Sequence, residues 1–156
     1  MRREELDLAQ RVWTIPGSRA KNAKAHIVHL CHQSLTVLKD RNDRGPFVFS
    51  VLGAKPYQEF SKAKRELDRL SGVTGWRLHD LRRTCVSGMA RLGVSPHVAD
   101  KILNHRSGTI SGVAAVYQRH EFLAERQAAL DLWGAHVGQL LRERSGEDRI
   151  NLKIVA

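Results

Sequence analysis

Cysteine is scarce in this chain of 156 residues, and its two copies, Cys31 and Cys85, are not spaced as a Cys-x-x-Cys pair. Both lie in apolar contexts, which predicts two reduced thiols in the core of an intracellular protein. No apolar run is long enough to cross a bilayer. The charged N-terminus, residues 1–5, is not followed by the apolar core of a signal peptide. We therefore expect a cytoplasmic protein with no membrane partner.

Acidic residues are outnumbered. The chain has 16 Asp and Glu against 26 Lys and Arg, and its formal net charge is +10 with histidine neutral. A basic surface favours a polyanionic partner, because each phosphate that it neutralises releases condensed counterions. Charge alone is weak evidence for nucleic-acid binding, so a motif has to support it. The length suits a single domain with one core.

The apolar pattern predicts an α+β fold that is mainly helical, with a small antiparallel β-sheet. We expect strands at 12–15 and 26–30, joined as a hairpin by a long basic loop, and a third short strand at 47–49. Helices are expected at 33–39, 57–70, 80–92, 95–104 and over most of 113–142, with a break near residue 120. In the third helix Leu81, Cys85, Met89 and Leu92 fall on one apolar stripe.

The chain contains no internal repeat, low-complexity tract or linker. We therefore expect one domain over residues 1–144 and a C-terminal tail over residues 145–156.

Three short motifs carry candidate chemistry: residues 79–84 (HDLRRT), residues 103–105 (LNH) and Tyr117. The planar guanidinium of Arg82 can donate two parallel hydrogen bonds to phosphate oxygens and stabilise charge on a pentavalent phosphorus. His79 lies three residues earlier, so the two share a face if both are helical. Its imidazole can exchange a proton near neutral pH. The phenol of Tyr117 needs cationic neighbours or deprotonation to act as a nucleophile.

Histidine and cysteine crowd one stretch that could be mistaken for a zinc site: His26, His29, Cys31 and His32. On a strand, His26 and His32 face one side while His29 and Cys31 face the other. Four ligands on opposite faces cannot converge on a tetrahedral ion. The chain also lacks a carboxylate cluster beside its phosphate-binding motif. We therefore expect no metal and no cofactor.

Taken together in order and spacing, these motifs resemble those of the tyrosine recombinases, the phage-integrase family. That family carries His-x-x-Arg on one helix, then Leu-Gly-His or a variant, and its nucleophilic tyrosine about a dozen residues later. The similarity extends to residues 13–16 (WTIP) and 19–22 (RAKN) before the second strand, and covers roughly residues 2–140. Asn104 departs from the commoner glycine of the Leu-Gly-His motif.

The resemblance implies a helical catalytic domain that cuts and rejoins double-stranded DNA. Tyr117 would attack the scissile phosphate and form a 3′-phosphotyrosine, which stores the bond energy without ATP or a metal. Arg82 and His105 would hold the phosphate, and His79 would serve in proton transfer. A lysine of the hairpin would protonate the departing 5′ oxygen. Lys21 matches that lysine best, and Lys24 is the alternative.

The residues expected to contact DNA lie around these motifs. They are Arg19, Lys21, Lys24, Arg83, Arg106 and Arg119.

One part of the family's site has no counterpart here. The family grips the same phosphate with a first arginine in a Thr-Gly-x-Arg-like setting upstream of the hairpin, and residues 2–8 of this chain align just after that helix. Neither Arg2 nor Arg3 follows such a turn, so we expect a catalytic domain truncated at its N-terminus. Removing one oxyanion donor costs about 10²–10³ in rate. A weak or inactive recombinase that retains DNA affinity is expected.

Loss of upstream helices would also leave apolar surface exposed. We therefore expect self-association on DNA, with a dimer through the C-terminal segment. Two alternatives stay open. One is a non-catalytic DNA-binding or oligomerisation module with an integrase fold, and the other is an unrelated helical interaction protein.

Overall fold

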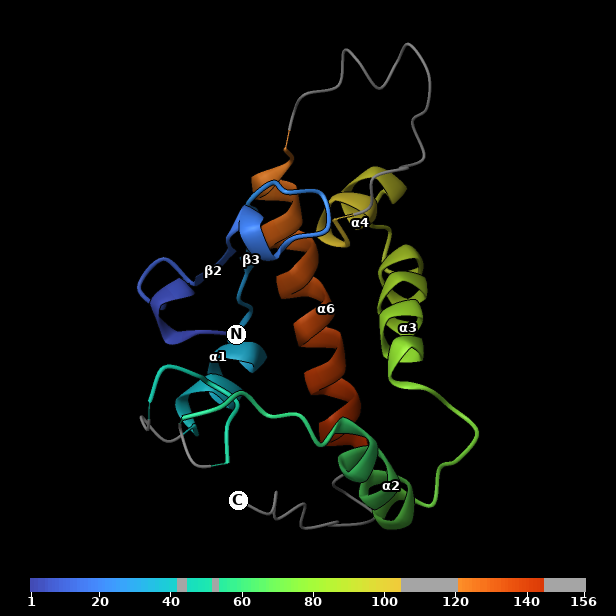
Figure 1. Ribbon diagram of the computed structural model, residues 1–156. Helices are drawn as coiled ribbons and strands as arrows, with labels where there is room; N and C mark the ends of the chain where they lie inside the picture. The colour runs from blue at the N-terminus through green and yellow to red at the C-terminus, as the bar shows by residue number, and fades with distance from the viewer. Residues whose placement is uncertain (42–44, 52–53, 105–120, 145–156) are drawn as a thin grey trace.

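The computed structural model describes residues 1–41, 45–51, 54–104 and 121–144. Its elements follow in this order (Figure 1): η1 (Arg3–Glu5), β1 (Leu6–Asp7), β2 (Val12–Ile15), η2 (Gly17–Arg19), β3 (His26–His29), α1 (His32–Lys39), α2 (Phe60–Ser71), α3 (Leu78–Arg91), α4 (Pro96–Ile102) and α6 (Leu123–Arg144). A mainly helical α+β fold with a small antiparallel sheet is thereby confirmed. None of the helices in these residues is long and apolar enough to span a membrane.

The three-stranded sheet has the order β1-β2-β3, and both pairs are antiparallel. The predicted hairpin is confirmed, with Val12 opposite His29 and Ile15 opposite His26. The prediction of a third strand at 47–49 was wrong, because β1 takes that place. Phe47 makes only an isolated bridge with Arg2. Backbone hydrogen bonds of residues 46–49 go partly to residues 1–3 and partly to Tyr57, so no continuous ladder forms.

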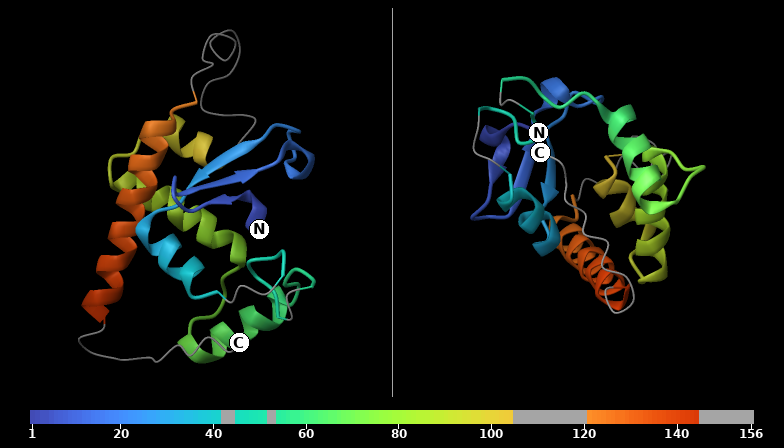
Figure 2. Two further views of the ribbon diagram at one scale, coloured as in Figure 1. Left: turned by 90° about the vertical axis from the view of Figure 1, so that its left-hand side faces the viewer. Right: turned by 90° about the horizontal axis from the view of Figure 1, so that it is seen from below.

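Helix α6 organises the core. It runs between the sheet and α1 on one side and α3 and α4 on the other (Figure 1), and α1 lies beside it in both views of Figure 2. Two glycines permit these close approaches. A Cβ on Gly88 of α3 would overlap the ring of Trp133 on α6, and one on Gly134 of α6 would meet Cys31 Sγ at 2.7 Å. Glycine is therefore required where these helices touch.

The helices lie close to their predicted positions, but the apolar stripe of α3 does not hold along its length. Met89 is buried and Cys85 is half-buried, whereas the side chain of Leu81 is 58% exposed. The buried residues of α3 are confined to its second half, where the helix meets α4 and α6. The expected break near residue 120, the first part of the last helix and the tail over 145–156 lie outside the described residues.

Candidate functional site

Arg82 lies on α3 and links two of the sequence motifs. Its Nη2 atom donates a hydrogen bond of 2.6 Å to the carbonyl oxygen of Leu103, the residue that caps the C-terminus of α4. The side chain is half-buried and still carries further N–H donors in its planar fork. Burial raises the pKa of the Cys85 thiol one turn along, and the positive charge of Arg82 only partly offsets this. Arg82 is therefore anchored at the end of α4 beside a protonated thiol.

Asn104 follows this cap in the left-handed conformation, with φ of +55°. Helices commonly end with such a residue, usually glycine and sometimes asparagine, which tolerates positive φ better than other side chains do. This explains how asparagine can stand where the family more often has glycine. The Oδ1 atom of Asn104 accepts a hydrogen bond of 2.8 Å from Nδ2 of Asn22. The end of α4 is thus joined to the loop between β2 and β3.

That loop, residues 16–25, carries both candidate lysines and is called the lysine loop below. It begins with the short helix η2 and is tightly folded: a Cβ on Gly17 would lie 2.6 Å from the carbonyl oxygen of Ala23. Ala23 itself has φ of +53°. Lys21 and Lys24 are exposed on this loop. The two lysines are far from Arg82 in the sequence. The fold nevertheless brings their loop to the end of α4, which Arg82 also contacts.

Arg19 lies at the start of the lysine loop and pairs with Glu5 at 2.6 Å. Burial opposes ionisation of Glu5. Hydrogen bonds from the Arg2 backbone and from Trp13, together with the charge of Arg19, nevertheless lower the pKa of this carboxyl. Part of the positive charge of Arg19 is therefore balanced within the fold.

His26 and Arg126 were not among the predicted site residues. His26 lies on β3, and its Nε2 atom is 3.2 Å from the carbonyl oxygen of Ile102, next to the one that Arg82 binds. Burial, and then the charge of Arg126, lower the pKa of His26, so its neutral form is favoured. Arg126, on α6, has only 4% of its surface exposed and donates to the Ile27 carbonyl of β3. These two side chains hold β3 between α4 and α6.

A signal for Arg126 was present in the sequence. It stands among apolar residues of the last helix at helical spacing, with Phe122 before it and Ala129 and Trp133 after it. An arginine on an apolar stripe needs buried partners, and here they are the carbonyls of Ile27 and Glu121.

The argument against a zinc site assumed that the crowded histidines share one strand, and they do not. The strand ends at His29, and His32 already begins α1, so the alternation applies only to His26 and His29. His29 is 3.6 Å from Asp131 on α6, whereas His26 approaches the Ile102 carbonyl of α4. No group of three or more His, Cys, Asp or Glu side chains that could hold a metal ion occurs in the part of the chain that the structure describes.

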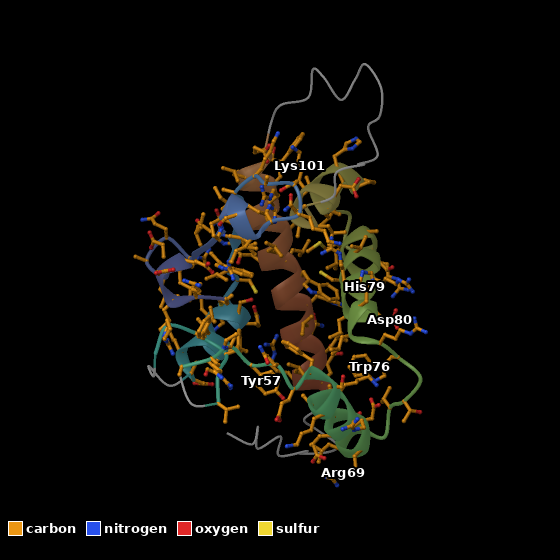
Figure 3. All side chains as sticks on the ribbon, viewed as in Figure 1. Tyr57, Arg69, Trp76, His79, Asp80 and Lys101 are labelled. Atoms are coloured by element: carbon orange, nitrogen blue, oxygen red, sulfur yellow. The ribbon has the colours of Figure 1, made fainter. Side chains whose placement is uncertain are left out.

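The remaining predicted residues either are exposed on α3 or fall outside the residues that the structure describes. His79 is exposed in the first turn of α3, one turn before Arg82, and Figure 3 labels it and Asp80 there, away from Lys101 of α4. Arg83 is exposed and pairs with Asp80 at 3.2 Å. The other predicted residues, His105, Arg106, Tyr117 and Arg119, lie outside the described residues.

The chain also matches a family of known proteins. The phage integrase family matches residues 1–122, a span that includes the lysine loop, the His-x-x-Arg motif, the Leu-Asn-His motif and Tyr117. The chain therefore belongs to the phage integrase family, and a tyrosine recombinase-type function follows from that membership. No curated protein and no solved structure matches it.

Proposed function

We propose that this chain is the DNA-binding catalytic domain of a site-specific recombinase, which cleaves and rejoins double-stranded DNA through a 3′-phosphotyrosine on Tyr117. The observation that carries the proposal is the junction at the end of α4. There the hydrogen bond from Arg82 to Leu103 and the one from Asn22 to Asn104 join three separate family motifs. Residues from three parts of the sequence need such a junction to act on one phosphate.

In this proposal Arg82 and His105 hold the scissile phosphate. Arg82 is suited to the task because one Nη atom anchors it to Leu103 and other N–H groups remain to donate to phosphate oxygens. His79 takes the phenol proton, and Lys21 protonates the departing 5′ oxygen, with Lys24 as the alternative. No metal is required, because these cationic groups stabilise the charge that develops at phosphorus.

Strand cleavage is proposed to be slow in this chain. Both N-terminal arginines have partners near the start of the chain or in the loop after α1. Arg2 pairs with Glu4 at 3.2 Å, and Nε of Arg3 donates to the Gly45 carbonyl at 3.1 Å. These 156 residues, assayed by themselves, should therefore cleave at a rate lower by about 10²–10³, the usual cost of one missing oxyanion donor.

DNA binding would use the exposed basic groups around the junction, which include Lys21, Lys24 and Arg83. Arg19, Arg106 and Arg119 complete the proposed contacts. Each neutralised phosphate should contribute roughly −0.9 to the slope of log K against log salt concentration. A salt-independent affinity would contradict the proposal.

The test of cleavage is a nicked duplex that traps the covalent intermediate. We expect slow formation of a protein–DNA adduct that Tyr117→Phe abolishes. The chain contains two tyrosines, so Tyr57→Phe is a matched control. The hydroxyl of Tyr57 donates to the Glu59 carbonyl at 3.1 Å, near α2 (Figure 3), and the adduct should persist in that variant. Salt-dependent binding with no adduct would support the alternative of a non-catalytic DNA-binding module.

We also propose that residues 1–144 act as one domain that self-associates on DNA. Support comes from large apolar side chains left exposed, such as Leu81 on α3 and Leu140 and Leu141 near the end of α6. Such surface favours association between copies, here through the C-terminal segment. A monodisperse monomer in light scattering, with and without DNA, would contradict this part.

A further inference from the structure

The contact between Asn22 and Asn104 joins side chains that are 82 residues apart in the sequence. The other hydrogen bond of Asn22 agrees with the orientation of its amide in this contact. The Oδ1 atom of Asn22 accepts the backbone N–H of Lys24 at 3.2 Å, so its Nδ2 atom is the one that faces Asn104. The Oδ1 atom of Asn104 then accepts at 2.8 Å. We call this pair of hydrogen bonds the asparagine clasp.

Each end of the clasp is fixed by its own surroundings. Asn104 is held by the left-handed end of α4, directly after the carbonyl that Arg82 binds. On the other side the lysine loop is folded tightly, with the carbonyl of Ala23 packed against Gly17. A short path therefore runs from Arg82 through the end of α4 and the clasp to Lys21, the residue just before Asn22.

We propose that Asn104 and Asn22 are positioning residues that hold the lysine loop beside the phosphate bound by Arg82, so that the ammonium of Lys21 reaches the departing 5′ oxygen. This inference rests on the proposed function. In the step concerned, the bond from the Tyr117 oxygen to phosphorus forms and the bond from phosphorus to the 5′ oxygen breaks. The phenol proton passes to His79, and a proton from Lys21 passes to the 5′ oxygen.

The clasp is a feature of this chain's own sequence. Glycine, the commoner residue at this position of the family motif, has no side chain to accept from Asn22. Substitution of Asn104 by glycine is therefore an unusually clean test. Glycine adopts positive φ without strain, so the end of α4 keeps its backbone and only the amide is lost.

The experiment compares two nicked duplexes that differ at one atom, the bridging 5′ oxygen or a sulfur in its place. A thiol is far more acidic than an alcohol, with a pKa of about 8.5 for cysteine, so a thiolate leaves without a proton donor. Asn104→Gly should slow cleavage of the oxygen substrate about tenfold, which is part of the roughly 10²–10⁴-fold that a general acid contributes, and slow the sulfur substrate less than about twofold. Lys21→Ala should give the same pattern with a larger loss.

Two further variants sharpen the assignment. Asn104→Asp keeps an oxygen acceptor and a residue type that tolerates positive φ, so it should restore most of the rate on the oxygen substrate. In a Lys21→Ala background, Asn104→Gly should add nothing, because the clasp acts through that lysine. If Asn104→Gly instead slows cleavage further in the Lys21→Ala background and has no effect in a Lys24→Ala background, Lys24 is the proton donor and the proposal is overturned.

Other results also decide the matter. Equal slowing of both substrates by Asn104→Gly, or no slowing of either, overturns the positioning role. If the wild-type chain cleaves neither substrate, the proposed function fails and the positioning role fails with it. Amide hydrogen exchange at Lys24 then reports the clasp on its own. Faster exchange in Asn104→Gly means that the contact exists in solution, and unchanged exchange means that it does not.

Discussion

Replacing Arg126 by methionine tests whether a buried cation fastens the hairpin to α6. The side chain is 4% exposed, donates to the Ile27 carbonyl on β3 and donates at 3.3 Å to the Glu121 carbonyl before α6. Its pairing with the Glu121 carboxylate at 3.8 Å adds little, because that carboxylate is 62% exposed. Methionine keeps an unbranched apolar stem, shorter than that of arginine, and removes every donor.

The expected loss of stability can be worked out from these two contacts. A hydrogen bond from a charged donor contributes about 1.5–3 kcal/mol, which gives roughly 3–6 kcal/mol for the pair. Burying the cation has a cost of its own, and that burial lowers the pKa of Arg126. Methionine has no charge to desolvate, so the net loss in the free energy of unfolding is smaller than the contribution of the two hydrogen bonds. We expect Arg126→Met to lower the free energy of unfolding by about 2–4 kcal/mol.

Urea unfolding followed by circular dichroism measures this change. The midpoint should fall while the slope with denaturant stays constant. Arg142→Met is the matched control, because Arg142 is exposed on the same helix, and surface changes of this kind stay within about 0.5 kcal/mol. A loss below about 1 kcal/mol for Arg126→Met, or equal losses for the two variants, would refute the reasoning, since both carbonyls would then find other donors.

Three further predictions concern packing, pH and backbone strain. Gly88→Ala should destabilise the fold by about 1–3 kcal/mol in urea unfolding, because the added methyl group overlaps the Trp133 ring. The pKa of His26 is lower in the folded chain than its unfolded value of about 6.5, so its contribution to stability is complete above that pH and is lost as the pH falls through the folded pKa. His26→Gln should therefore weaken the dependence of the melting temperature on pH below about 6.5. Ala23→Gly should stabilise the chain by about 0.5 kcal/mol, because glycine accepts the φ of +53° without strain.

Each of these variants has a nearby control. Ser87→Ala changes an exposed residue just before Gly88 and should leave stability unchanged. Ile27→Val, next to His26 on the same strand, changes no titratable group and should preserve the wild-type pH dependence below about 6.5. Ala25→Gly, in the same loop but without a positive φ, should destabilise rather than stabilise. Stabilisation by Ala25→Gly equal to that of Ala23→Gly would mean that strain at residue 23 is not the cause.

Local signals predicted most of the secondary structure. Strand β2 was predicted with the bounds that it has, and α4 begins at Pro96, where serine followed by proline marks a helix start. The errors arose where distant parts of the chain decide the outcome. Residues 47–49 have strand-like composition, but their hydrogen bonds go to two separate segments. Leu81 obeys the helical period, yet the helices that cover Met89 do not reach it.

The candidate site was predictable as a set of residue types and not as an arrangement. Order and spacing along the chain make Arg82 and Lys21 candidates, because they match the motifs of the family in sequence. The order of residues does not reveal which backbone carbonyl the Arg82 guanidinium binds at the end of α4, because every residue has a backbone carbonyl. His26 was missed for a related reason. Its partner is the Ile102 carbonyl, and no residue type marks a backbone acceptor.

The sequence predicts the backbone conformation of Asn104 but not the partner of its side chain. Its conformation could have been anticipated, because a residue just after a helix end often has positive φ and asparagine is the best substitute for glycine there. From the sequence, the change from glycine removes no catalytic atom, and on that ground it would be neutral. The fold gives the extra amide a partner in Asn22, brought close only because the hairpin folds back onto α4. Return to the commoner glycine removes this acceptor and should therefore slow the reaction in this chain.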